Sequence, residues 1–159
     1  GRFPRGIAVT PDSSTAYIAV MGSSDVAVVD LVTYEVSWIR GVGAGPRHLV
    51  IGPDGRYLYV TLNAAGAVAK VDLTSRTVVA KASSPGQPRS MTISEDGTAL
   101  YVVNYAADAM SKIRTSDMTQ VQRIPTNHHP IGITYDPPTR QVWVACYSGS
   151  IMVFTDSAP

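Results

Sequence analysis

Apolar and polar residues alternate along most of this chain with a period of two, in short segments separated by turns rich in Pro, Asp, Gly and Ser. Such alternation places successive side chains on opposite faces of a β-strand, whereas a helix repeats about every 3.6 residues. The pattern therefore predicts an all-β protein built from short strands. We expect them at residues 5–10, 15–20, 26–31, 35–40, 47–51, 56–62, 67–73, 77–82, 89–94, 98–104, 109–114, 120–124, 131–135, 141–146 and 150–154.

The expected strands fall into units that repeat every 42 residues, and a fixed period of this size is typical of stacked supersecondary units. Four antiparallel strands in each unit of about 40 residues predict the blade of a β-propeller, which buries both faces of its sheet against its neighbours. We expect one partial propeller with blades at residues 1–42, 43–84, 85–126 and 127–159, the last with three strands. The equivalent positions are Pro4, Pro46, Pro88 and Pro130, and then Tyr17, Tyr59, Tyr101 and Trp143.

The composition narrows the class of protein without identifying a ligand. Hydrophobic residues make up 45% of the 159 residues, which is ample for a buried core. A net charge of +1 without any run of Lys or Arg speaks against nucleic acid as a partner. The single cysteine, Cys146, excludes an intrachain disulfide and is expected to be a buried thiol. No apolar run approaches the roughly 20 residues of a transmembrane segment.

Two units carry a recognisable repeat. In the second unit Ile51 to Gly55 precedes Leu58 to Asn63, and in the third Ile93 to Gly97 precedes Leu100 to Asn104. Over its whole length the chain resembles the YVTN-repeat β-propeller family, although the fourth unit diverges from Trp143 onward. The resemblance implies a ring of seven blades and an extracellular, periplasmic or cell-surface location. The repeat specifies a fold and says little about chemistry.

About four blades cannot close a ring of seven, so one blade face at each end would be bare. If each face carries about 500 Å² of apolar area, burying both faces would contribute tens of kcal/mol of gross stabilisation, at roughly 25 cal/mol per Å². The resemblance implies the C-terminal part of a ring, so we expect missing N-terminal blades or another chain to complete it. A fragment, one chain of a split ring and a self-assembling half of an eight-bladed ring all remain open.

The loops that lead from the outermost strand of one blade to the innermost strand of the next open on one mouth of the central channel. These loops cover residues 41–46, 83–88 and 125–130, and an arginine occupies the same position of three inner strands, as Arg5, Arg47 and Arg89. Their guanidinium groups could bind a carboxylate or phosphate through rigid forks of donors. The commoner alternative is that each arginine pairs with Asp25 or Asp108 of a neighbouring blade, or with a backbone carbonyl.

Histidines and tyrosines complete the expected mouth. His48 stands where the other units have Gly or Ser, and His128 and His129 lie in the 125–130 loop. Imidazoles can bind metals or transfer protons, but without an accompanying acidic cluster we expect a solvated loop pair, with no metal and no cofactor. Tyr105 and Tyr147 follow equivalent second strands, and aromatic rims suit flat or sugar-like ligands. The candidate ligand-binding residues are Arg5, Arg47, His48, Arg89, Tyr105, His129 and Tyr147.

The sequence contains no catalytic or nucleotide-binding signature of the G-x-S-x-G, H-E-x-x-H or phosphate-loop type. The residues favour a binding or scaffolding module for a protein or a small, anionic ligand at the channel face, and the resemblance implies that it lies outside the cytoplasm. Two alternatives remain open. One is the propeller of an enzyme, either an oxidoreductase or a lactone hydrolase, and the other is the sensor ectodomain of a membrane protein. No catalytic residue can be assigned.

Overall fold

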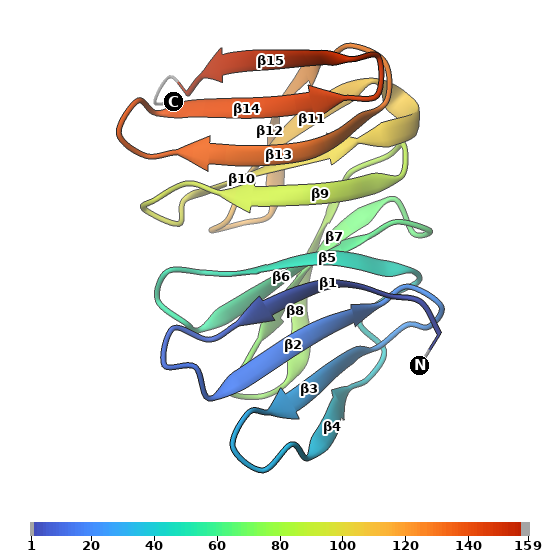
Figure 1. The fold of residues 1–159 in the computed structure, drawn as a ribbon, viewed down its shortest axis with the longest axis vertical. Helices are drawn as coiled ribbons and strands as arrows, with labels where there is room; N and C mark the ends of the chain where they lie inside the picture. Colours follow the sequence, from blue (N-terminus) through green and yellow to red (C-terminus); the bar gives the residue numbers. More distant parts are fainter. Residues whose placement is uncertain (1, 157–159) are drawn as a thin grey trace.

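The computed structural model describes residues 2–156 and contains four antiparallel sheets arranged one after another (Figure 1). In each sheet the strands follow chain order, so every sheet is a simple meander. The first strands of the sheets, β1, β5, β9 and β13, lie side by side and form the inner wall. This is the radial arrangement of a β-propeller, with three four-stranded blades and a three-stranded fourth, as the sequence predicted.

The strands have the following bounds. Blade 1 contains β1 (Pro4–Val9), β2 (Thr15–Val20), β3 (Val26–Asp30) and β4 (Val36–Ile39). Blade 2 contains β5 (Pro46–Ile51), β6 (Tyr57–Leu62), β7 (Ala67–Asp72) and β8 (Thr77–Ser83). Blade 3 contains β9 (Pro88–Ile93), β10 (Ala99–Asn104), β11 (Ala109–Arg114) and β12 (Thr119–Pro125). Blade 4 contains β13 (Pro130–Asp136), β14 (Gln141–Cys146) and β15 (Ser150–Thr155).

These bounds differ from the predicted ones by at most one residue at either end. Turn chemistry explains the agreement, because side-chain carboxylates hold the hairpins. In the turn between β9 and β10, the carboxylate of Asp96 accepts hydrogen bonds from Ser94 Oγ at 2.6 Å and from the Thr98 amide at 3.0 Å. One element was not predicted, the 3₁₀ turn η1 (Tyr105–Ala107) that follows β10. The ends of the first and last predicted blades, residues 1 and 157–159, lie outside the described residues.

The core consists of clusters between successive blades. Tyr59 of blade 2 is 3% exposed and packs in a cluster with Met91 and Leu100 of blade 3. Tyr101 of blade 3 packs in the equivalent way against blade 4 and stacks on Tyr135, with ring centroids 5.9 Å apart. The repeated tyrosine therefore joins each blade to the next, which explains its fixed spacing.

The two outermost faces break this pattern. Trp143 holds the position of the repeated tyrosine but is 41% exposed, because no blade follows blade 4 among the described residues. Ile7 is 64% exposed, whereas its equivalent Leu49 is 2% exposed, because residues 2–156 contain no blade in front of blade 1. Trp143 is therefore a sheet residue of β14 that the described chain leaves partly exposed. Both faces carry large apolar side chains that the inner blades bury.

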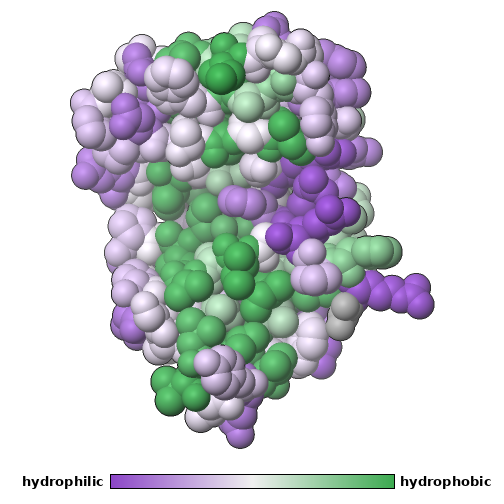
Figure 2. All heavy atoms as spheres, in the orientation of Figure 1, coloured by the Kyte–Doolittle hydropathy of each residue, from purple (hydrophilic) through white to green (hydrophobic). Residues whose placement is uncertain are grey.

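The side that contains the inner strands is largely hydrophobic, with a hydrophilic patch beside the ends where β5 and β9 begin (Figure 2). These are the ends at which Pro46 and Pro88 open the strands. Within residues 2–156 no helix is long and apolar enough to cross a membrane.

Candidate functional site

The mouth of the channel is built at the start of the inner strands. Pro46 and Pro88 are each the first residue of their strand, where the missing amide hydrogen interrupts no ladder. The residue after each proline is an arginine, so the repeat places Arg5, Arg47 and Arg89 at equivalent points of β1, β5 and β9. Close contact between neighbouring inner strands then brings the three side chains to one end of the channel.

The three guanidinium groups lie close enough to influence one another. Arg47 is half-buried, and its pKa is lowered first by burial and then by the positive charges of Arg89 and Arg5. One of its nitrogens lies 3.5 Å from the sulfur of Met21. Among residues 2–156 none of the three arginines forms an ion pair with a carboxylate. The cluster is therefore a concentration of positive charge that the described chain does not neutralise.

The acidic residues expected as partners of these arginines are engaged elsewhere. Asp25 pairs with Arg40 at 2.7 Å and accepts a hydrogen bond from the Gly41 amide at 2.9 Å. These two contacts lower its pKa below the ordinary value. Asp108 pairs with His128. The alternative in which Asp25 or Asp108 neutralises the mouth arginines is therefore wrong.

Aromatic rings continue the cluster toward blade 4. The guanidinium carbon of Arg89 lies 3.3 Å from the centre of the Tyr105 ring, a cation–π contact. Tyr105 also stacks on His129, with centroids 4.1 Å apart, and meets Tyr147 edge-on at 5.9 Å. The structure thus brings together Arg89, Tyr105, His129 and Tyr147, which come from blades 3 and 4.

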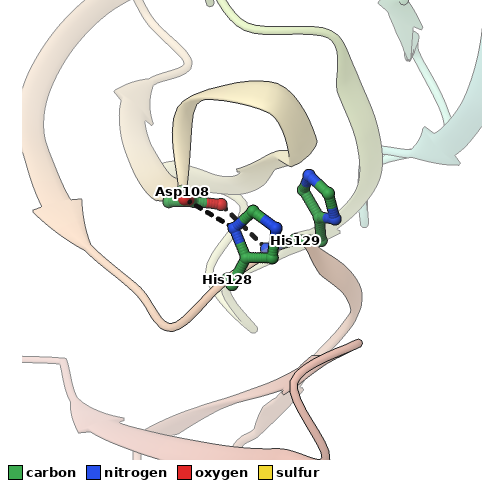
Figure 3. Close-up of side chains that lie close together, drawn as sticks. All are labelled: Asp108, His128 and His129. Atoms are coloured by element: carbon green, nitrogen blue, oxygen red, sulfur yellow. Dashed lines mark hydrogen bonds and ion pairs between the residues drawn. The ribbon is translucent and has the colours of Figure 1, made fainter.

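A second group of donors adjoins the aromatic rings. Asp108 Oδ2 lies 3.0 Å from His128 Nδ1, and Asp108 Oδ1 accepts a hydrogen bond of 2.8 Å from the His129 amide (Figure 3). The two imidazole rings stack with centroids 3.5 Å apart. One potential metal-binding atom from each of the three residues lies within 4.8 Å of the other two. The pKa of Asp108 is lowered, first by the His129 amide and then by His128.

His48 is the predicted site residue that stands apart. Among the described residues no ring contact or ion pair joins it to the rest of the mouth, and its Nδ1 is buried without a hydrogen-bond partner. Burial, followed by the charge of Arg47, lowers its pKa, so the ring is neutral near pH 7. A Cβ on Gly6, its equivalent in blade 1, would lie 2.8 Å from His48 Cα, against the next blade. Because His48 holds the same repeat position in blade 2, we infer that its side chain points into the interface between blades 2 and 3.

Sequence reasoning missed the acidic member of the histidine cluster. Asp108 precedes β11, and its equivalent in blade 2 is Gly66, so the repeat offers no reason to look for a carboxylate there. Its left-handed backbone, with φ 45° and ψ 50°, is the one geometric signal, since few residues other than Gly adopt it. A search for non-glycine residues at glycine positions of the repeat would have found it.

The arrangement has two kinds of chemistry to offer. The arginines supply fixed positive charge for an anion, and the neighbouring exposed ring of Tyr147 supplies an apolar face. Asp108 and the two histidines supply nitrogen and oxygen donors for a cation or a proton. Elsewhere, a hollow of about 550 Å³ lies at the opposite ends of the strands, lined by Lys112, Arg140 and Asp156, and it contains no residue of the mouth.

Comparison with solved structures supports the architecture. Hydrazine synthase of Kuenenia stuttgartiensis matches with a TM-score of 0.89 and 25% identity, covering 96% of this chain and 46% of that one. Two putative 6-phosphogluconolactonases match with lower identity. That of Bacteroides uniformis has a TM-score of 0.80 and 18% identity, covering 97% of this chain and 50% of that one. That of Bacteroides fragilis has a TM-score of 0.81 and 20% identity, covering 97% of this chain and 51% of that one.

The last two likenesses show the fold alone. The chain spans about half the length of each solved chain that it matches. Among curated proteins none matches the sequence. The model of one protein family matches residues 12–149, which is most of the chain. This β-propeller chain therefore belongs to the cytochrome D1 heme domain family.

Proposed function

We propose that this propeller domain binds a small ligand with carboxylate or phosphate groups at the mouth of its channel. The observation that carries the proposal is the cluster of Arg5, Arg47 and Arg89, which has no carboxylate partner among residues 2–156. Three neighbouring guanidinium groups repel one another, and after burial this repulsion is the next cause of the lowered pKa of Arg47. A bound anion would remove this repulsion and accept several charge-assisted hydrogen bonds.

The aromatic side of the mouth favours a ligand with a flat portion. The guanidinium of Arg89 and the ring of His129 cover the faces of the Tyr105 ring, and Tyr147 beside it is the aromatic ring exposed to a ligand. An anionic group on the arginines would place the rest of a ligand next to these rings. A planar polycarboxylate or an aromatic phosphate is therefore the ligand chemistry that we propose.

The family's name implies a haem, and the donors of this chain can be compared with that group. The arginines would suit the carboxylates of a macrocycle as they suit other carboxylates. The histidine cluster does not suit its iron, because a macrocycle fills four coordination positions and leaves one for a protein donor on each side. Here Asp108, His128 and His129 offer three donors within 4.8 Å of one another. We derive no function through haem for this chain.

Isothermal titration calorimetry with benzene-1,3,5-tricarboxylate, and separately with inorganic phosphate, tests the proposal in phosphate-free buffer of low ionic strength. We expect one tricarboxylate per chain. Arg47→Gln and Arg89→Gln should each weaken binding about 10-fold or more, because each removes hydrogen bonds between charged groups worth about 1.5–3 kcal/mol. Added salt should weaken binding further, since the attraction is electrostatic.

Arg123→Gln is the matched control, because Arg123 is exposed on the outermost strand β12 and its loss changes the net charge equally. Its affinity for the tricarboxylate should stay within about twofold of the original chain, as expected for a charge remote from the site. The proposal fails if neither anion binds, or if Arg123→Gln weakens binding as much as Arg47→Gln.

Three further features of the proposed function rest on the resemblance and on the bare outer faces. We propose that the repeats are of the YVTN type, that the domain operates outside the cytoplasm, and that further propeller blades cover the faces at Ile7 and Trp143. Support for the last comes from the exposure of both side chains, 64% and 41%. The enzyme and sensor alternatives stay predictions.

A further inference from the structure

We propose that Asp108, His128 and His129 form a site for a divalent first-row transition-metal ion, separate from the arginine cluster. The three side chains come from two blades. Asp108 lies between η1 and β11 in blade 3, and the histidines lie in the loop from β12 to β13. Figure 3 shows the ring of His128 between the carboxylate of Asp108 and the ring of His129.

The geometry is close to that of a coordination sphere. One donor atom from each residue lies within 4.8 Å of the other two, and Asp108 Oδ2 and His128 Nδ1 are 3.0 Å apart. Adjacent ligands of a six-coordinate ion with bonds of about 2.1 Å are about 3.0 Å apart. The same spacing holds their hydrogen bond, so an ion would replace the proton between these two atoms, and rotation of the His129 ring out of its stacks would bring in the third donor.

The third donor is free to take part. Among the described residues neither ring nitrogen of His129 has a hydrogen-bond partner, and its contacts with Tyr105 and His128 are face-to-face stacks. Stacking holds the ring from its faces and leaves its nitrogen-bearing edge accessible. The His129 backbone is also fixed, since its amide donates to Asp108 Oδ1 at 2.8 Å.

Comparison of the repeats shows that the fold does not need these side chains. Asp108 occupies the position that Gly66 occupies in blade 2, and both have a left-handed backbone, with φ 45° and 62°. His129 occupies the position of Gly45, with φ 54° and 71°. Glycine suits this backbone better than any other residue. At the other two junctions the equivalent pairs are Ser24 with Gly45 and Gly66 with Gln87, so the repeat itself does not require the pair of donors at Asp108 and His129.

Two imidazoles and one carboxylate on one side of an ion leave its remaining positions open. This ligand set suits Fe²⁺, Co²⁺, Ni²⁺ and Zn²⁺, and it excludes ions such as Ca²⁺ that prefer oxygen ligands throughout. The open side adjoins Tyr105 and, beyond it, Arg89. An anion held by the arginines could also reach the ion, and this last step alone rests on the proposed function.

Calorimetric titration of the metal-free protein with Zn²⁺ and Ni²⁺ tests the site, using protein without a histidine tag in a non-chelating buffer without carboxylate or phosphate. We expect one ion per chain with a dissociation constant in the micromolar range. Co²⁺ should give visible absorption bands typical of mixed nitrogen and oxygen ligands. A chain that binds none of the three ions at submillimolar concentration would overturn the proposal.

Asp108→Gly and His129→Gly are the informative variants, because each introduces the residue that blade 2 uses at the same position. Both should fold like the original chain by circular dichroism, and each should weaken Zn²⁺ binding at least 10-fold. Glu35→Gln, which removes an exposed carboxylate from blade 1, should leave binding unchanged. Zn²⁺ affinity that is unchanged in Asp108→Gly and His129→Gly would disprove this assignment.

The metal site and the anion site can fail independently. Arg47→Gln should retain Zn²⁺ binding in anion-free buffer, because the arginine does not ligate the ion. If the tricarboxylate fails to bind but Zn²⁺ binds and responds to Asp108→Gly, the metal site stands and the anion site is wrong. If Zn²⁺ fails to bind but the tricarboxylate binds, the anion site stands and the metal site is wrong.

Discussion

The interface between blades 2 and 3 and the outer face of blade 4 use equivalent residues in opposite surroundings. Tyr59 on β6 is 3% exposed, whereas Trp143, at the equivalent position of β14, is 41% exposed. On the outer face Ile151 and Val153 of β15 are also 70% and 44% exposed. The same repeat position is thus core in one place and surface in the other.

The difference shows that a blade is stabilised mainly by its neighbours. The sheet hydrogen bonds of blade 4 are as regular as those of blade 2, with continuous pairing between β14 and β15. What blade 4 lacks is the next apolar face. In repeat proteins stability is approximately the sum of terms for each repeat and for each interface, so an outer blade has one interface term fewer.

The largest expected effect comes from truncating the equivalent aromatic residues. Tyr59→Ala should lower the free energy of unfolding by about 3–5 kcal/mol, as for other large aromatic residues removed from a core. Trp143→Ala should lower it less, by about 1–2 kcal/mol, because 41% of Trp143 is already exposed to solvent. Urea denaturation followed by circular dichroism measures both.

The same pair of variants reports on what covers the outer face in solution. If Trp143→Ala costs as much as Tyr59→Ala, the face is packed against something, and the comparison drawn from the single chain is wrong. A dependence of the transition on protein concentration would then identify a second copy as the cover, because association stabilises a protein by mass action.

The strands could be predicted from the sequence because their signals are local. Alternation of apolar residues and turns such as that at Asp96 act over a few residues, and the period of 42 then places equivalent strands together. The grouping of Arg47 and Arg89 followed from the same symmetry. The lowered pKa of Arg47 did not, because it depends on how deeply that side chain is buried and on the positive charges around it.

Features that break the repeat could not be predicted in this way. The exposure of Trp143 depends on the absence of a neighbour, which no local pattern encodes. Asp108 reaches the histidine loop only because its left-handed backbone turns the carboxylate toward residues 20 positions later. The direction of His48, between blades rather than into the mouth, follows from the close approach of β1 and β5 at Gly6.

A smaller loss of stability is expected from replacing the lysines that connect one blade to the next. Lys112 Nζ lies 2.7 Å from Asp156 Oδ1, and both side chains are 8% exposed. Its equivalent Lys70 donates instead to the Thr115 carbonyl at 2.8 Å. Lys112→Met should cost about 2–4 kcal/mol, since it leaves a buried carboxylate whose one remaining ionic partner among residues 2–156 is Arg140. Lys70→Met should cost about 1 kcal/mol, the worth of one hydrogen bond.

Acid should reduce the difference in stability between the original chain and Lys112→Met. Burial alone would raise the pKa of Asp156, but its hydrogen bonds and neighbouring positive charges, those of Lys112 first, together outweigh it, so the pKa lies below its ordinary value of 3.8. A lowered pKa in the folded state means that the stabilisation is complete above pH 3.8 and is lost as the pH falls through the folded value. Urea denaturation of the original chain and Lys112→Met at pH 7 and pH 3 measures it. An equal difference at both pH values would contradict this role of Asp156.

The smallest expected effect compares two glycines with positive φ, one at a blade junction and one beside the outer face. Gly86 has φ 98°, and an added Cβ would collide with the Cβ of Ala107 in η1. Gly149 has φ 81°, and an added Cβ would meet nothing within 4 Å.

Gly149→Ala should therefore cost only the backbone strain, about 1 kcal/mol, and Gly86→Ala about 2 kcal/mol or more because the collision adds to it. Thermal unfolding of both variants measures the difference. Equal costs would mean that the loop at Gly86 moves aside to accept the added Cβ. The difference between an interface and an outer face would then not apply to the loops.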